Sequence, residues 1–117
     1  MELEMKALVV WFIANGDVEK ALNVLAEHYG VNVPRLKVGL PKGRRRNLLG
    51  CYSARTRTIF VLNSDVLKNP FVVLHEFYHH LRTTVNLEHR GSEKNANEFA
   101  KSFIRVYQST GVEGFGK

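Results

Sequence analysis

The stretch His75-Glu76-Phe77-Tyr78-His79 lies within a run of helix-forming residues and follows the pattern H-E-x-x-H. On a helix, residues four positions apart lie one above the other, so His75 and His79 can both direct a ring nitrogen at one metal ion. Zn²⁺ binds neutral imidazoles, and a carboxylate close to the activated water can take its proton as the water attacks a carbonyl. The stretch therefore predicts a zinc-binding helix, with Glu76 as the general base.

The residues around this motif favour a buried helix with one polar seam. Leu74, Phe77 and Leu81 fall together on the side of the helix opposite the two histidines. Two imidazoles and a carboxylate on an apolar helix would cost several kcal/mol if they were unpaired, and a bound metal removes that cost. Asn69-Pro70 is a suitable start for this helix, which we expect to run to about Thr84.

A catalytic zinc ion usually takes three protein ligands, so the chain must supply one more donor. Glu93, Glu98 and His89 compete for this position. Glu93 lies at the edge of the apolar face of the last predicted helix, whereas Glu98 falls on its polar side, so Glu93 is the better candidate. His89, in a predicted loop, stays as the alternative. Asn97 lies one turn after Glu93 and can accept the second ring N–H of His75.

The remaining elements indicate an α+β fold. Helical periodicity predicts two N-terminal helices, over about 3–14 and 18–29, and a last helix from Glu93 to about Ser109. Three short segments of β character lie between them and predict a small three-stranded, mainly antiparallel sheet: Arg35–Leu40, Leu48–Tyr52 and Thr58–Leu62. The fold class is thus α+β, with the zinc-binding helix after the sheet.

Length and composition limit the chain to one domain. It has 117 residues, of which 44% are apolar, enough for a single modest core. The acidic start of the chain and the short apolar run at 7–14 match neither a signal peptide nor a membrane span. Cys51 is the only cysteine, so no internal disulfide can form. We expect a cytoplasmic protein.

The formal net charge of the chain is +6, and four of its basic residues lie in one predicted loop: Lys42, Arg44, Arg45 and Arg46. Such a loop attracts nucleic acid, acidic proteins or anionic lipid through the same electrostatic field. A solvated loop that only aids solubility is the favoured interpretation. In the alternative interpretation, the protein is a zinc-containing regulator that uses this loop to hold nucleic acid or a partner.

With these residues in place, the chain resembles the gluzincin clan of zinc peptidases, in which H-E-x-x-H is completed by a Glu on a later helix, often within E-x-x-x-D. Here the second motif runs from Glu93 to Asn97, with Asn at the position of the usual Asp. The segment 93–100 is also similar to the E-x-E-A-N-x-F-A signature of ImmA/IrrE-type metallopeptidases, with Asn95 in place of the second Glu.

Upstream, residues 50–52 and 58–63 look like the strand pair that those proteins place before the active-site helix. In size, the chain looks most like the minigluzincins of the proabylysin type, so that residues 1–117 would be a single minimal zinc metallopeptidase domain. The resemblance implies an endopeptidase that takes a peptide or unfolded protein, with the edge of the sheet pairing with an extended substrate. It also implies latency, with residues 111–117 as a regulatory or flexible tail lying in the cleft.

Two questions stay open at this stage. A SprT-like protease acting on DNA-bound proteins would need His89 as the third ligand in place of Glu93. The developing oxyanion needs a hydrogen-bond donor, and the sequence does not rank the candidates, which are Tyr52, Tyr78, His80, His89 and Tyr107.

Overall fold

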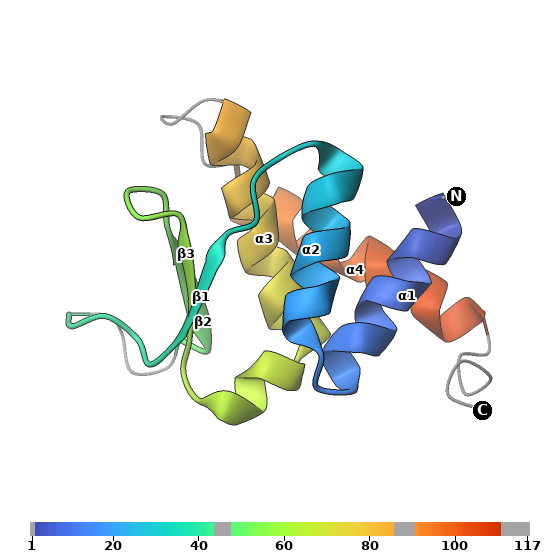
Figure 1. The fold of residues 1–117 in the computed structure, drawn as a ribbon, viewed down its shortest axis with the longest axis horizontal. Coiled ribbons are helices and arrows are strands. Elements are labelled where there is room, and N and C mark those ends of the chain that lie inside the picture. Colours follow the sequence, from blue (N-terminus) through green and yellow to red (C-terminus); the bar gives the residue numbers. More distant parts are fainter. Residues whose placement is uncertain (1, 44–47, 86–90, 111–117) are drawn as a thin grey trace.

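The computed structural model describes residues 2–43, 48–85 and 91–110, and within them the chain forms an α+β fold. Figure 1 shows the small sheet on one side of the molecule and the helices on the other. The fold class predicted from the sequence is confirmed. The elements in chain order are α1 (Glu2–Ala14), α2 (Val18–Tyr29), β1 (Arg35–Val38), β2 (Gly50–Ser53), β3 (Thr58–Val61), the 3₁₀ helix η1 (Ser64–Lys68), α3 (Pro70–Val85) and α4 (Glu93–Ser109).

The three strands form one sheet in the order β1-β3-β2, with β2 at an edge. Strands β2 and β3 form the expected antiparallel pair, in which Cys51 lies opposite Phe60. Strand β1 pairs with β3 in parallel, with Leu36 opposite Ile59. The sheet is therefore mixed, because the segment between β1 and β2 returns the chain to the far side of β3 instead of forming a hairpin.

Helix α3 lies between the sheet and α4 and contacts both. Its apolar side supplies Val73, Leu74 and Phe77, which are fully buried. Ala96 and Ala100 of α4 are also fully buried, and their small side chains allow α4 to approach α3 closely. The helix that carries the H-E-x-x-H motif is therefore the central element of the core. None of the helices in the described residues combines the length and apolar character needed to cross a bilayer.

Gly50 allows the edge strand to pass very close to α3. A Cβ atom at this position would lie 2.8 Å from Cγ1 of Val72, 3.0 Å from the carbonyl oxygen of Phe60 and 3.6 Å from Cγ of Glu76. The first two separations are too short for ordinary contact, and the β-branched Val72 side chain has little rotamer freedom on a helix. Glycine at position 50 therefore fixes the spacing between β2 and the turn of α3 that carries Glu76.

We predict that Gly50→Ala lowers the free energy of unfolding by about 1–3 kcal/mol, because the added methyl group forces β2 away from α3. Chemical denaturation monitored by circular dichroism measures this change. Ser53→Ala, on the same strand, is the matched control and should leave stability within about 0.5 kcal/mol of wild type. A Gly50→Ala variant as stable as the control would contradict the close approach.

A buried histidine also ties the sheet to α3. His80 is 1% exposed, and its two ring nitrogens have different partners. The hydroxyl of Tyr52 lies 2.8 Å from Nδ1, and the carbonyl oxygen of Asn32 lies 2.7 Å from Nε2. A neutral imidazole satisfies both contacts by donating from Nε2 to Asn32 and accepting the Tyr52 hydroxyl at Nδ1. His80 thus joins α3 to β2 and to the segment that leads into β1.

Burial lowers the pKa of His80 below its ordinary value of 6.5, with a smaller lowering contribution from Arg57, while the hydrogen bond to Asn32 acts in the opposite direction. The folded imidazole therefore stays neutral at pH values where the unfolded one takes up a proton. This stabilisation is complete above about pH 6.5 and is lost as the pH falls toward the folded pKa.

We therefore predict that the free energy of unfolding of the metal-free protein decreases as the pH falls below about 6.5, and that His80→Gln makes this dependence shallower. Urea denaturation of both proteins in chelator, across that range, gives the comparison. Parallel pH profiles for wild type and His80→Gln would show that His80 does not carry the effect.

Candidate metal centre

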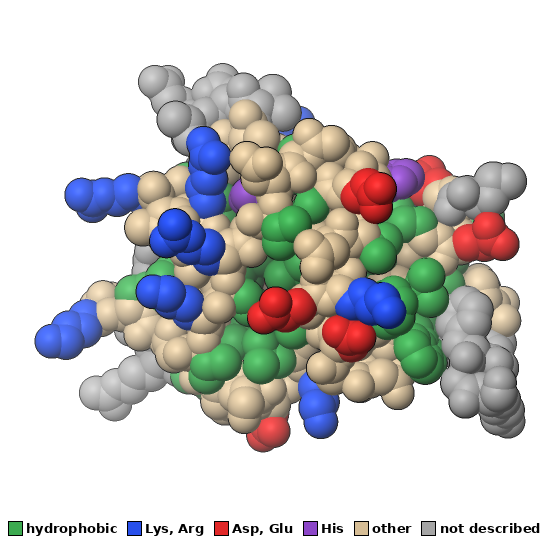
Figure 2. All heavy atoms as spheres, in the orientation of Figure 1, with side chains coloured by type: hydrophobic (Ala, Val, Ile, Leu, Met, Phe, Trp, Pro, Cys, Tyr) green, Lys and Arg blue, Asp and Glu red, His purple; other side chains and the backbone are tan. Residues whose placement is uncertain are grey.

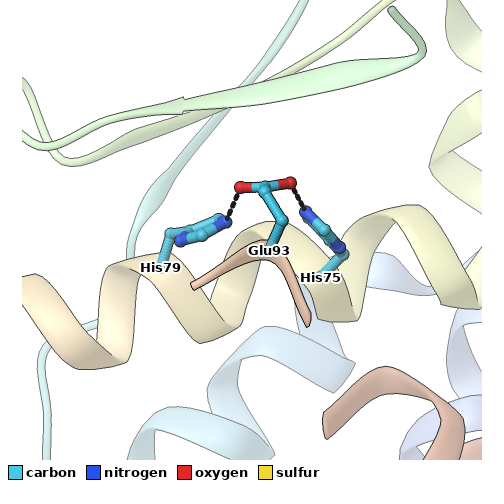
Figure 3. Close-up of side chains that lie close together, drawn as sticks. All are labelled: His75, His79 and Glu93. Atoms are coloured by element: carbon cyan, nitrogen blue, oxygen red, sulfur yellow. Dashed lines mark hydrogen bonds and ion pairs between the residues drawn. The ribbon is translucent and has the colours of Figure 1, made fainter. Parts of the chain in front are cut away.

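Three side chains from two helices converge on one point. His75 and His79 lie one turn apart on α3, and Glu93 is the first residue of α4. Nε2 of His75 lies 2.9 Å from Oε1 of Glu93, and Nε2 of His79 lies 2.9 Å from Oε2 of the same carboxylate. Figure 3 shows the carboxylate of Glu93 between the two rings. The structure thus brings together the three residues that the sequence singled out as metal ligands.

The donor atoms are close enough to share one ion. They all lie within 4.8 Å of one another, and ligand atoms around a tetrahedral zinc ion are about 3.4 Å apart at bond lengths of about 2.1 Å. Two imidazoles and one carboxylate are one of the usual donor sets of catalytic zinc, which leaves a fourth position for water. His75, His79 and Glu93 therefore form a group that could hold a metal ion.

The hydrogen bonding of His75 supports a cation at this point. Its Nδ1 atom lies 2.9 Å from Oδ1 of Asn97, which can only accept, so Nδ1 carries the hydrogen. In a neutral imidazole, Nε2 then holds a lone pair, and this lone pair faces Oε1 of Glu93. Two acceptors 2.9 Å apart repel each other unless a proton or a metal ion lies between them.

The contact between Asn97 and His75 that the sequence suggested is present. It fixes the orientation of the ring and leaves Nε2 as the atom that could coordinate a metal, the arrangement usual for metal-binding histidines. Asn97 lies one turn after Glu93 on α4. One face of α4 therefore supplies both Glu93, the third candidate ligand, and Asn97, which orients the ring of His75.

The position of Glu93 depends on the two residues before it. Gly91 has a φ of +77°, and a Cβ atom there would lie 2.5 Å from Cε2 of Tyr78, so the chain passes directly against α3. Ser92 then caps α4, because its hydroxyl accepts the backbone N–H of Asn95 at 3.0 Å. The close passage and the cap together start α4 at the point where the first side chain reaches the two histidines.

The candidate centre opens into a cavity of about 450 Å³ between α3 and the edge strand β2. Glu76 lines this cavity together with the three candidate ligands and is 8% exposed. Glu93 is the exposed member of the group, with 75% of its side chain accessible, whereas the two histidines are largely covered. The rest of the lining is mostly apolar and comes from α3, β2 and the residues before β2: Leu48, Leu49, Gly50, Cys51, Tyr52, Phe71 and Val72.

Other candidates from the sequence lie away from this group. Glu98 pairs with Arg105 at 3.3 Å on the exposed side of α4. His80 faces Tyr52 and Asn32 and does not approach the candidate ligands. Tyr52 lines the same cavity as the candidate ligands, but its hydroxyl hydrogen is given to His80, so it connects β2 with α3.

Tyr78 and Tyr107 are half-buried on α3 and α4. Tyr78 packs against the rings of His79 and Phe99. His89, Arg44 to Arg46 and the tail at 111–117 lie outside the described residues, as does the latency predicted from the tail. Lys42 is exposed in the loop after β1.

Sequence reasoning missed the positioning roles of Gly50, Gly91 and the Tyr52–His80–Asn32 contacts. Each glycine is visible in the sequence next to a predicted element, but the atom that it must avoid belongs to a distant part of the chain. His80 itself was the available signal for these contacts, because a histidine on the apolar side of a helix requires polar partners.

Comparison of the chain with models of protein families, with curated proteins and with solved structures found no match in any of the three.

We predict that Asn97→Ala weakens zinc binding by about 10–100-fold, because His75 loses the partner that orients its ring. Competition with a chromophoric chelator measures the affinity. Asn95→Ala, also in the first turns of α4 but exposed, is the matched control and should bind zinc like the wild type. Equal zinc affinities for both variants would rule out the orienting role.

Proposed function

We propose that the chain is a zinc-dependent peptidase, with His75, His79 and Glu93 as the metal ligands and Glu76 as the general base. The observation that carries this proposal is the presence of Glu76 in the same cavity as the candidate donor set, beside the edge of a sheet. A structural metal site needs neither a fourth open position nor a carboxylate beside it. A hydrolase needs both.

Zinc bound by these three side chains would supply Lewis-acid polarisation of the scissile carbonyl and of the attacking water. Glu76 lies next to His75 in the chain and lines the cavity from α3. Its carboxylate would take the proton of the water as the water attacks, and would then deliver this proton to the leaving amine.

Strand β2 is well placed to hold an extended substrate. It is an edge strand, and it lines the cavity along 50–52. The N–H of Leu62 donates to the carbonyl of Leu49 at 2.8 Å, so in the alternating antiparallel pattern the N–H and C=O of Gly50 point away from β3, toward the free edge of the sheet. A peptide added along this edge would pass Glu76 with its backbone aligned, a common mode of peptide recognition. This geometry favours unfolded or flexible protein substrates.

The decisive variant is Glu76→Gln, which keeps the size of the side chain and removes the base. We expect cleavage of an unfolded protein substrate to fall by at least about 100-fold, with zinc content near one per chain in both proteins. Metal analysis and a fluorescent casein assay give the two readouts. Glu98→Gln, on the exposed side of α4, is the control and should retain full activity.

If residues 111–117 block the cleft, activity should appear only after truncation, so the same variants are compared in a chain that ends at Thr110. Zinc binding without cleavage in either length would contradict the proposed hydrolase. Cleavage by Glu76→Gln equal to that of wild type would contradict the assigned base.

A further inference from the structure

Four exposed basic side chains lie together on the sheet side of the molecule. Arg35 and Lys37 belong to β1, and Arg55 and Arg57 belong to the turn between β2 and β3. We call these four residues the sheet cation cluster. Figure 2 shows lysine and arginine side chains gathered over the part of the molecule that carries the sheet in Figure 1, with no acidic side chain among them.

The topology of the sheet brings these residues together. Arg35 and Lys37 are two positions apart on β1, so their side chains leave the same face of the strand. The backbone N–H of Arg35 donates to the carbonyl of Arg57 at 2.8 Å, which makes the two arginines neighbours. The parallel pairing of β1 with β3 therefore joins two basic segments that are twenty residues apart in the sequence.

The charge of this region is unbalanced. Residues 28–64 contain eight of the 17 lysines and arginines and no Asp or Glu, while the other 80 residues carry nine basic and 11 acidic residues. The positive net charge of the chain thus originates entirely in the sheet region. None of the ion pairs found among the described residues involves a member of the cluster. Its charge is therefore available to an external anion.

We propose that the sheet cation cluster binds the phosphate backbone of nucleic acid. Three of its four members are arginines, whose planar guanidinium groups match the geometry of phosphate oxygens. Residues 28–64 carry no carboxylate that would repel the phosphates of a regularly spaced polyanion, and Glu19 of α2 is the acidic residue that lines a cavity beside Arg35. This binding is independent of base sequence.

The arrangement of apolar side chains argues against a lipid surface. Peripheral membrane binding places exposed apolar residues on one face with the cations beside them. Among the described residues near the sheet, three of the four exposed apolar side chains, Val38, Leu49 and Leu62, lie at the end of the strands opposite the turn that carries Arg55 and Arg57. The fourth, Val33, is close to Arg35 in the chain. One exposed valine is too small an apolar surface to serve as a membrane anchor.

The cluster is separate from the candidate metal centre. None of its four residues is among those that line the cavity between α3 and β2. Reversing their charge therefore leaves the donor set and Glu76 in place, and nucleic-acid binding can be tested whether or not the chain is a peptidase.

The test is the binding of a short fluorescent mixed-sequence DNA duplex, followed by anisotropy over a salt series. The cluster variant combines three substitutions: Arg35→Glu, Lys37→Glu and Arg55→Glu. The matched control combines three substitutions on exposed helix surfaces: Lys20→Glu, Lys101→Glu and Arg105→Glu. Both variants change the net charge by the same amount. Circular dichroism verifies that each is folded.

We expect wild type to bind DNA with a plot of log affinity against log salt concentration whose slope is about −3 to −4. The cluster variant should lose at least about tenfold in affinity at low salt and give a slope flatter by about 3, whereas the control should stay within about threefold of wild type. Equal losses in the two variants, or no DNA binding by wild type, would overturn the proposal. Displacement of DNA by polyglutamate at equal charge concentration would assign the surface to acidic proteins instead.

Discussion

The contact between the carboxylate of Glu93 and the imidazoles of His75 and His79 is the interaction around which the candidate metal centre is arranged. It joins α3 to α4 through three polar groups next to an apolar core, and the hydrogen bond from His75 to Asn97 leaves a lone pair of His75 directed at an acceptor. A proton or a metal ion between these atoms would remove that repulsion. The same contact therefore joins two helices of the fold and forms the candidate metal centre.

The structure around the contact holds α3 from both sides. On one side, Gly50 lets β2 approach the helix, and the His80 contacts to Tyr52 and Asn32 bind it to the sheet region. On the other side, the buried alanines of α4 allow the glutamate helix to pack closely, and Gly91 directs the chain into its first turn. Rigid elements on two sides position ligands more accurately than loops do. The cavity lies between α3 and β2, and Gly50 is part of its lining.

The sequence predicts the features that depend on residues close together in the chain, and it does not predict contacts between distant segments. The H-E-x-x-H spacing fixes the relation of His75 and His79 because both lie on one helix, and helical periodicity places Glu93 and Asn97 on one side of α4. The parallel pairing of β1 with β3, and the gathering of Arg35 beside Arg57 that results from it, depend on the path of the intervening segment. No pattern within either strand specifies a partner so distant in the chain. The partners of His80 and the atoms close to Gly91 are hidden from the sequence for the same reason.

The most direct test of the metal centre is anomalous diffraction at the zinc absorption edge from crystals of the zinc-loaded protein. Our account predicts one strong peak about 2.0–2.2 Å from Nε2 of His75, Nε2 of His79 and a carboxylate oxygen of Glu93. A peak held by other side chains, or crystals of zinc-treated protein without a peak between α3 and α4, would contradict it.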